Sequence, residues 1–302
     1  STFDPKIEGR SSVNAERPSI PSGSLPALFL PAPGKESTLN CGKSKRIAPV
    51  ALRIDVLTLF PRMVEGVFSE SLLGKARDKK LADVRVWDIR DFALDKHRQA
   101  DDRPYGGGPG MVLKPEPLFG ALKAVGAGAP LHGKGARRCA ARRPTVIYMS
   151  PQGRPLTQTL ADELARKKQL VVIAGHYEGI DERILDWVDV EVSVGDVVLT
   201  GGEIPAMALV DAVVRKVPGV VKEKASLEWD SFASGWEGRL DCPHFTRPAE
   251  WRGRSVPAVL LGGNHKEIEL WRATASRAAT HKKRPDLVKL STTRRGRANV
   301  KK

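Results

Sequence analysis

Short apolar runs alternate with amphipathic stretches along this chain, and the pattern predicts an α/β fold that begins near Leu52. Runs rich in Val, Ile and Leu are typical of buried strands, and they lie at 53–60, 81–89, 145–150, 169–175 and 189–194. Helices are expected between them, after Pro61, at 117–125, at 157–167 with Thr157 as the cap, and at 204–216. Such alternation implies a mainly parallel sheet with helices on both faces.

The pattern changes after Pro218. Residues 222–240 are polar and contain glycine, so we expect them to pack poorly. Asn264 is predicted to begin a helix with Glu267 as its capping-box partner. The expected organisation is therefore a disordered or targeting extension at 1–51, an α/β domain at 52–221, a mobile linker or lid at 222–240, a small helical domain at 241–288 and a basic tail at 289–302.

The first fifty residues are rich in Ser and Pro and poor in acids, which is typical of disorder. This composition is shared with transit peptides, while IEGR at 7–10 matches a protease site used in cloning. A transit peptide, a natural extension and a remnant of cloning are therefore all alternatives. No apolar run is long enough to span a bilayer, so no membrane partner is expected. The expected location is cytoplasmic, or a plastid or mitochondrion if this segment is a transit peptide.

The net charge of +15 is concentrated at the carboxyl-terminal end. Residues 282–302 carry nine Lys and Arg against one Asp, and 126–143 form a predicted basic loop. A basic tail beside a nearly balanced core indicates an anionic partner, most often a nucleic acid, and a merely solubilising tail is the alternative.

Cysteine and histidine show no arrangement that predicts a disulfide framework or a metal site. The three cysteines, Cys41, Cys139 and Cys242, are scattered, and no CxxC occurs. The histidines have no ligand spacing, so we assign no metal ligand. Carboxylates and arginines near glycine-rich loops are better candidates for chemistry, namely Asp101, Asp102, Glu178, Arg215, Asp230 and Asp241.

Three glycine-bearing loops follow three of the predicted strands. They read SPQGRPL, GHYEGIDER and GDVVLTGGE, and DDRPYGGGPGM at 101–111 is a fourth glycine-rich segment. Ligands of parallel sheets bind beyond the carboxyl ends of the strands. The four segments therefore predict one pocket walled by backbone, suited to a flat heteroaromatic ligand. Walker and GxGxxG patterns are absent, which disfavours nucleotide hydrolysis and leaves an adenine-containing cofactor open.

These loops occur in order with IDVLTLFP, PAMALVDAVVR, DSF, LDCPHFTRP and VPAVLLGGNH. With these motifs the chain resembles the bacterial tRNA (guanine-N1)-methyltransferases, the TrmD family, over about residues 52–288. The resemblance implies a SPOUT-type α/β domain with a trefoil knot, a helical tRNA-binding domain and a homodimer with sites at the subunit interface. It also implies S-adenosyl-L-methionine as the cofactor, with help from Mg²⁺. The implied substrate is N1 of the guanine at position 37 of tRNA, 3′ of the anticodon.

The resemblance also carries residue roles. It implies Asp230 as the general base, Arg215 as an essential arginine, and substrate contacts from His97, Asp101, Gly110 and Asp241. The implied cofactor residues are Tyr148, Met149, Ser150, Pro151, Gly153, Gly175, Glu178, Val194, Gly195, Asp196, Val197, Val198, Leu199, Gly201 and Gly202. Two positions depart from the family pattern, which commonly has arginine where His176 stands and tyrosine where Val197 stands.

Two alternatives stay open. One is a SPOUT-type methyltransferase that acts on another RNA site. The other is an RNA-binding module that has lost catalysis, and the retained Arg215, Asp230 and Asp241 argue against it.

Overall fold

The computed structural model describes residues 52–131 and 143–288. The extension at 1–51, the greater part of the basic loop at 126–143 and the tail at 289–302 lie outside the described residues.

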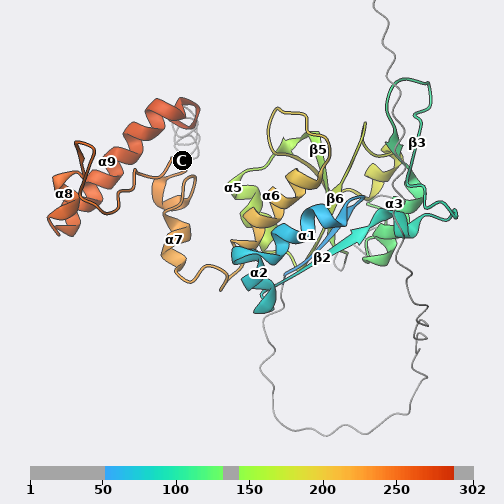
Figure 1. Ribbon diagram of the computed structural model, residues 1–302, viewed down its shortest axis with the longest axis horizontal. Coiled ribbons are helices and arrows are strands. Elements are labelled where there is room, and N and C mark those ends of the chain that lie inside the picture. The colour runs from blue at the N-terminus through green and yellow to red at the C-terminus, as the bar shows by residue number, and fades with distance from the viewer. Residues whose placement is uncertain (1–51, 132–142, 289–302) are drawn as a thin grey trace, which may run out of the picture. The chain divides into compact units, whose positions relative to one another are not determined.

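A five-stranded sheet forms the centre of the α/β domain, with the strand order β2-β1-β6-β5-β7 (Figure 1). All its pairings are parallel, which confirms the predicted sheet. The strands are β1 (Leu52–Thr58), β2 (Ala82–Asp88), β5 (Thr145–Pro155), β6 (Gln169–Ala174) and β7 (Val190–Ser193).

Helices cover both faces because the strands bury apolar side chains alternately on each side. Along β1, Val56 belongs to one apolar cluster and Leu57 to the other. The first cluster is covered by α1 (Pro61–Ser69), α2 (Ser71–Asp78), α5 (Gln158–Ala165) and α6 (Glu203–Val214). The second is covered by α3 (Pro115–Ala124) with the 3₁₀ helices η1 (Ile89–Phe92) and η2 (Glu182–Trp187).

One predicted turn is instead part of a strand. SPQGRPL was expected to turn away after residue 150, but β5 continues to Pro155 with a shift of register between Met149 and Arg154. The continuation lies directly against β7, where a Cβ on Gly153 would come within 2.4 Å of the Val192 nitrogen. Contact with a strand distant in sequence therefore extends β5.

The segment after the α/β domain contains α7 (Lys224–Glu228) and η3 (Ser234–Trp236). The expectation that 222–240 packs poorly is wrong, because Trp236 is only 4% exposed. Its ring lies 4.9 Å from the Trp229 ring, and its indole N–H donates to the Trp229 carbonyl at 2.6 Å. Movement of this segment as a lid stays a prediction.

The helical region contains β8 (Glu250–Trp251), β9 (Arg254–Ser255), α8 (Ala258–Leu261) and the long α9 (His265–Lys283). Asn264 does precede α9, but its side chain makes no capping hydrogen bond, so the predicted capping box is wrong. Instead α9 is anchored midway, where the buried Ser276 hydroxyl donates to the Leu240 carbonyl at 2.6 Å. Within the described residues, no helix has the length and apolar character needed to cross a membrane.

Candidate active site

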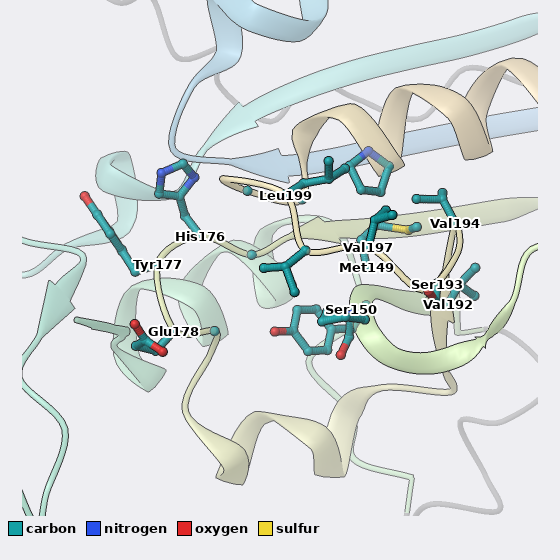
Figure 2. A pocket seen from close by; sticks show the side chains of 18 residues that line it. Met149, Ser150, His176, Tyr177, Glu178, Val192, Ser193, Val194, Val197 and Leu199 are labelled. Carbon is teal, nitrogen blue, oxygen red and sulfur yellow. The ribbon is translucent and has the colours of Figure 1, made fainter. Parts of the chain in front are cut away.

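A cavity of about 250 Å³ lies at the ends of β6 and β7, beside the middle of β5 (Figure 2). Its walls come from the three segments that the sequence analysis placed around one pocket, at 148–151 within β5 and in the loops at 175–179 and 192–202. Figure 2 shows Met149, Ser150, Val197 and Leu199 around the centre of this space, with His176, Tyr177 and Glu178 towards one end.

Backbone brings two of these loops into direct contact. The Gly202 N–H donates to the Gly175 carbonyl at 2.6 Å, and His176 forms an antiparallel bridge with Gly201. A Cβ on Gly202 would lie 2.8 Å from the Gly175 nitrogen, a separation that real Cβ atoms essentially never adopt. Glycine is therefore needed here for close approach of two backbones.

The interior of the cavity is mostly apolar, with a few polar groups. Val194, Val197, Val198 and Leu199 are exposed apolar residues on one loop. Burial raises the pKa of Tyr148 above its ordinary value, which marks the apolar surroundings of its hydroxyl. A flat apolar ligand with polar edges suits such walls.

The glycine-rich segment at 101–111 meets this site through Glu178. The segment begins with the two-residue strand β3 (Asp101–Asp102), which pairs with β4 (Val112–Leu113) directly after the segment. The Glu178 N–H donates to the Met111 carbonyl at 3.1 Å, and a Cβ on Gly110 would lie 2.5 Å from the Glu178 carboxylate. Gly110 also has φ +84°, which favours glycine. The segment therefore contacts one end of the cavity.

A buried carboxylate that the sequence analysis missed supports the wall of the cavity. Glu203 is 1% exposed at the start of α6, and its carboxylate accepts from the Thr58 hydroxyl at 2.7 Å. His176 Nδ1 lies 3.5 Å from the other carboxylate oxygen, and the His176 ring packs on Phe60 at 4.8 Å. These contacts join β1, the loop after β6 and α6. The sequence offered one indication of this role, namely that Glu203 directly follows Gly201 and Gly202.

Twelve of the fifteen residues that the resemblance assigned to the cofactor line the cavity. Gly153, Gly195 and Asp196 do not, and Gly153 serves the packing of β5 on β7 instead. Six lining residues were not predicted, although they are near neighbours of predicted ones: His176, Tyr177, Gly179, Val192, Ser193 and Pro205.

Arg215 and Asp230, the residues assigned to catalysis, form an ion pair of 2.5 Å with both side chains partly exposed. Arg215 is the C-cap of α6, whereas Pro205 in its first turn lines the cavity. Ten residues of helix separate the two, which is roughly 15 Å at 1.5 Å per residue. Within one chain, the structure therefore keeps this pair away from the cavity.

The residues assigned to the substrate are dispersed. Asp101 pairs with Leu113 in the β3–β4 ribbon, and His97 lies exposed in the preceding loop. Asp241 lies near the ion pair, because its N–H donates to the hydroxyl oxygen of Ser231, the residue that follows Asp230, at 3.0 Å. None of His97, Asp101, Gly110 and Asp241 lines the cavity itself.

The described residues include one cluster of side chains of the kinds that bind metal ions, which the sequence analysis did not identify. Ligand atoms of Asp241, Cys242 and His244 lie within 4.8 Å of one another. The Asp241 carboxylate already accepts from the Cys242 N–H at 2.6 Å and contacts His244 Nε2 at 2.8 Å. Burial raises the pKa of the Cys242 thiol, and the charge of Asp241 adds to the effect. The neutral thiol is favoured, which works against metal ligation.

The parallel sheet and the backbone-walled cavity at its carboxyl edge define an α/β protein with a site suited to a small ligand. The family model described as tRNA (Guanine-1)-methyltransferase TrmD matches residues 52–290. The chain belongs to this family.

Relatives named tRNA (guanine-N(1)-)-methyltransferase are about half identical to it. The relative from Endomicrobium trichonymphae is 50% identical over 238 residues, which cover 79% of this chain and 100% of the relative. The relative from Pseudoalteromonas translucida (strain TAC 125) is 51% identical, with 79% of this chain and 88% of the relative covered. The relative from Geobacillus kaustophilus (strain HTA426) is 51% identical, with 78% and 91% covered.

Proposed function

We propose that this protein is a methyltransferase that transfers a methyl group from S-adenosyl-L-methionine to N1 of guanine 37 in tRNA. The observation that carries the proposal is the cavity between the middle of β5 and the ends of β6 and β7, in a chain of the tRNA (guanine-1)-methyltransferase family. Its partner is tRNA, in keeping with the net charge of +15.

The cavity fits the proposed cofactor. The apolar loop at 194–199 offers a wall for an adenine ring, while backbone groups of the lining segments suit its polar edge. The Glu178 carboxylate at one end suits a hydroxyl or a positive charge. Bound there, S-adenosyl-L-methionine supplies a methyl group activated by its sulfonium.

The proposed roles of Asp230 and Arg215 follow from the chemistry of guanine. N1 carries a proton at neutral pH, so its lone pair is a poor nucleophile until that proton leaves. Asp230 accepts it as the general base. Negative charge then grows on O6, where the planar guanidinium of Arg215 stabilises it. The observed ion pair keeps both groups together before the guanine arrives.

The length of α6 supports a homodimer with a shared site. Methyl transfer needs the reacting atoms at about 3 Å, whereas roughly 15 Å of helix separates Pro205 at the cavity from Arg215. A second copy can supply its own Arg215 and Asp230 to the cavity. Exposed apolar side chains on α1 and α6, which pack against each other, suit such an interface: Met63, Val67 and Ile204.

The proposal is tested by methylating an unmodified tRNA transcript with the purified protein and mapping the product. Methylation at N1 of guanine 37 supports it. A methyl group on another nucleotide or on a ribose supports the alternative of a different RNA site, and binding without transfer supports the inactive module. Adding a chelator to the same reaction tests the predicted help from Mg²⁺.

The shared site is tested by mixing two inactive variants. An Asp230→Ala subunit combined with a subunit inactivated in its cofactor loops should give heterodimers with one intact site. Homodimers of each variant are the control. Heterodimers that form and show no activity would refute the shared site and leave the methylation proposal standing.

A further inference from the structure

A second cavity, of about 420 Å³, lies in the helical region between α8, α9 and the base of the β8–β9 hairpin. The Val256 N–H donates to the Ala249 carbonyl at 2.8 Å and closes the hairpin, and both residues line the cavity. This volume falls in the range of ligand-binding pockets. None of its lining residues has a catalytic, cofactor or substrate role assigned above.

The lining combines aromatic rings with arginines. Phe245 is 49% exposed, and its ring centroid lies 6.1 Å from that of Trp271 at an angle of 58°. Arg247 and Arg272 also line the cavity, and none of its twelve lining residues is Asp or Glu. A ligand here meets π-faces and positive charge together.

The surrounding surface favours a nucleic acid over an apolar peptide. Residues 241–288 carry nine Lys and Arg against five Asp and Glu. On the adjoining hairpin, the exposed Trp251 has the Arg252 guanidinium 4.8 Å from its ring centroid. Sites for single-stranded RNA use this combination, because bases stack on aromatic rings while arginines contact the phosphates.

We propose that this cavity binds one unstacked base of the anticodon arm, distinct from the guanine that is methylated. The inference rests on the proposed function, since it assumes that tRNA is the substrate. The chain from Asp241 to His244 leads directly into Phe245. The cavity therefore lies next in sequence to the carboxylate expected near the target guanine, which suits a second base of the same loop.

The test combines protein variants with RNA variants. A series of anticodon stem–loops, each with one abasic nucleotide, is titrated against the full chain and against Phe245→Leu at fixed salt. Stacking on an aromatic ring contributes a factor of about five to 150 per base. For one nucleotide, removing the base should weaken binding to the wild-type protein by such a factor and leave binding to Phe245→Leu unchanged.

Matched substitutions keep the test independent of folding. Leu261 lines the cavity and is 63% exposed, whereas Leu270 is 68% exposed and lies outside it. Leu261→Ala should weaken RNA binding and Leu270→Ala should not. On α9, Arg272→Gln should weaken binding more than Arg277→Gln, because only Arg272 lines the cavity. Thermal melts show that each variant is folded.

Three results would overturn the inference. The first is that Phe245→Leu weakens binding of every abasic stem–loop by the same factor as binding of the intact one, so that the two effects are independent. The second is equal binding by the Leu261 and Leu270 variants. The third is a change in oligomeric state for Leu261→Ala with RNA binding intact, which would make the cavity an interface between copies. Wild-type methylation of guanine 37 alongside any of them would show that the proposed function stands and only the base site fails.

Discussion

Gly202→Ala tests whether close backbone contact builds the wall of the cavity proposed to bind the cofactor. The added Cβ would lie 2.8 Å from the Gly175 nitrogen, 2.9 Å from the Ala174 Cα and 3.0 Å from the Ala174 carbonyl carbon. All three neighbours belong to the backbone at the end of β6, so no side chain can rotate away. Accommodating the methyl group must separate the two loops and lengthen the bond of 2.6 Å between Gly202 N–H and the Gly175 carbonyl.

The size of the effect follows from the cost of overpacking. Inserting a methyl group into a well-packed site typically costs about 1–3 kcal/mol. If the loops spread to relieve this strain, they must close again when the cofactor binds. The overpacking cost is then subtracted from the binding free energy, which weakens binding by about five- to 150-fold. Any strain that remains in the free protein lowers the melting temperature instead, by about 2–4 °C for each kcal/mol in a chain of this size.

Calorimetric titration with S-adenosyl-L-methionine and a thermal melt measure the two components separately. Gly66→Ala is the matched control, because nothing lies within 4 Å of a Cβ at that exposed position in α1. Alanine there should raise stability by up to about 1 kcal/mol and leave the dissociation constant unchanged. A Gly202→Ala protein with wild-type affinity and melting temperature would refute the proposed wall.

Four further outcomes are expected. Asp230→Asn should lower the single-turnover methylation rate by about two to four orders of magnitude at saturating substrates, and a near-normal rate would move the role of base to Asp241. Trp236→Ala should lower the free energy of unfolding of its segment by about 3–5 kcal/mol, measured by hydrogen exchange; unchanged protection would show that its burial is unimportant. Because the pKa of Cys242 is raised, thiolate forms only at higher pH, so its alkylation should begin at a higher pH than in an unfolded control. Deleting 289–302 should weaken tRNA binding and flatten its salt dependence without changing the methylated base, as product mapping can check.

The local pattern of apolar residues was sufficient to place the strands of the central sheet, apart from the second half of β5. The apolar runs at 53–60 and 169–175 correspond to β1 and β6 within two residues, because β-branched runs between helical stretches leave few alternatives. The common cavity of the three glycine-bearing segments was also predictable, since the carboxyl ends of parallel strands meet at one edge, although the first segment continues as β5.

Long-range contacts determined what the sequence pattern missed. The strand through Gly153 depends on β7, and the packing of 222–240 depends on Trp229 meeting Trp236. At Asn264 the residue type marked the helix start, but the expected capping bond does not form. Each of these features depends on a partner or a side-chain orientation that local patterns do not specify.

Helix α6 joins the two halves of the candidate site and also keeps them apart. Its first turn lines the cavity through Pro205, and its last turn ends at Arg215, which pairs with Asp230. A lid movement of 222–240 within one chain could carry Asp230 towards the cavity, but Arg215 is fixed at the end of a rigid helix, so the ion pair would have to break. Docking against a second copy, as proposed, requires no such loss, because both groups would enter the partner's cavity together. The intact ion pair therefore favours a shared site over closure within one chain.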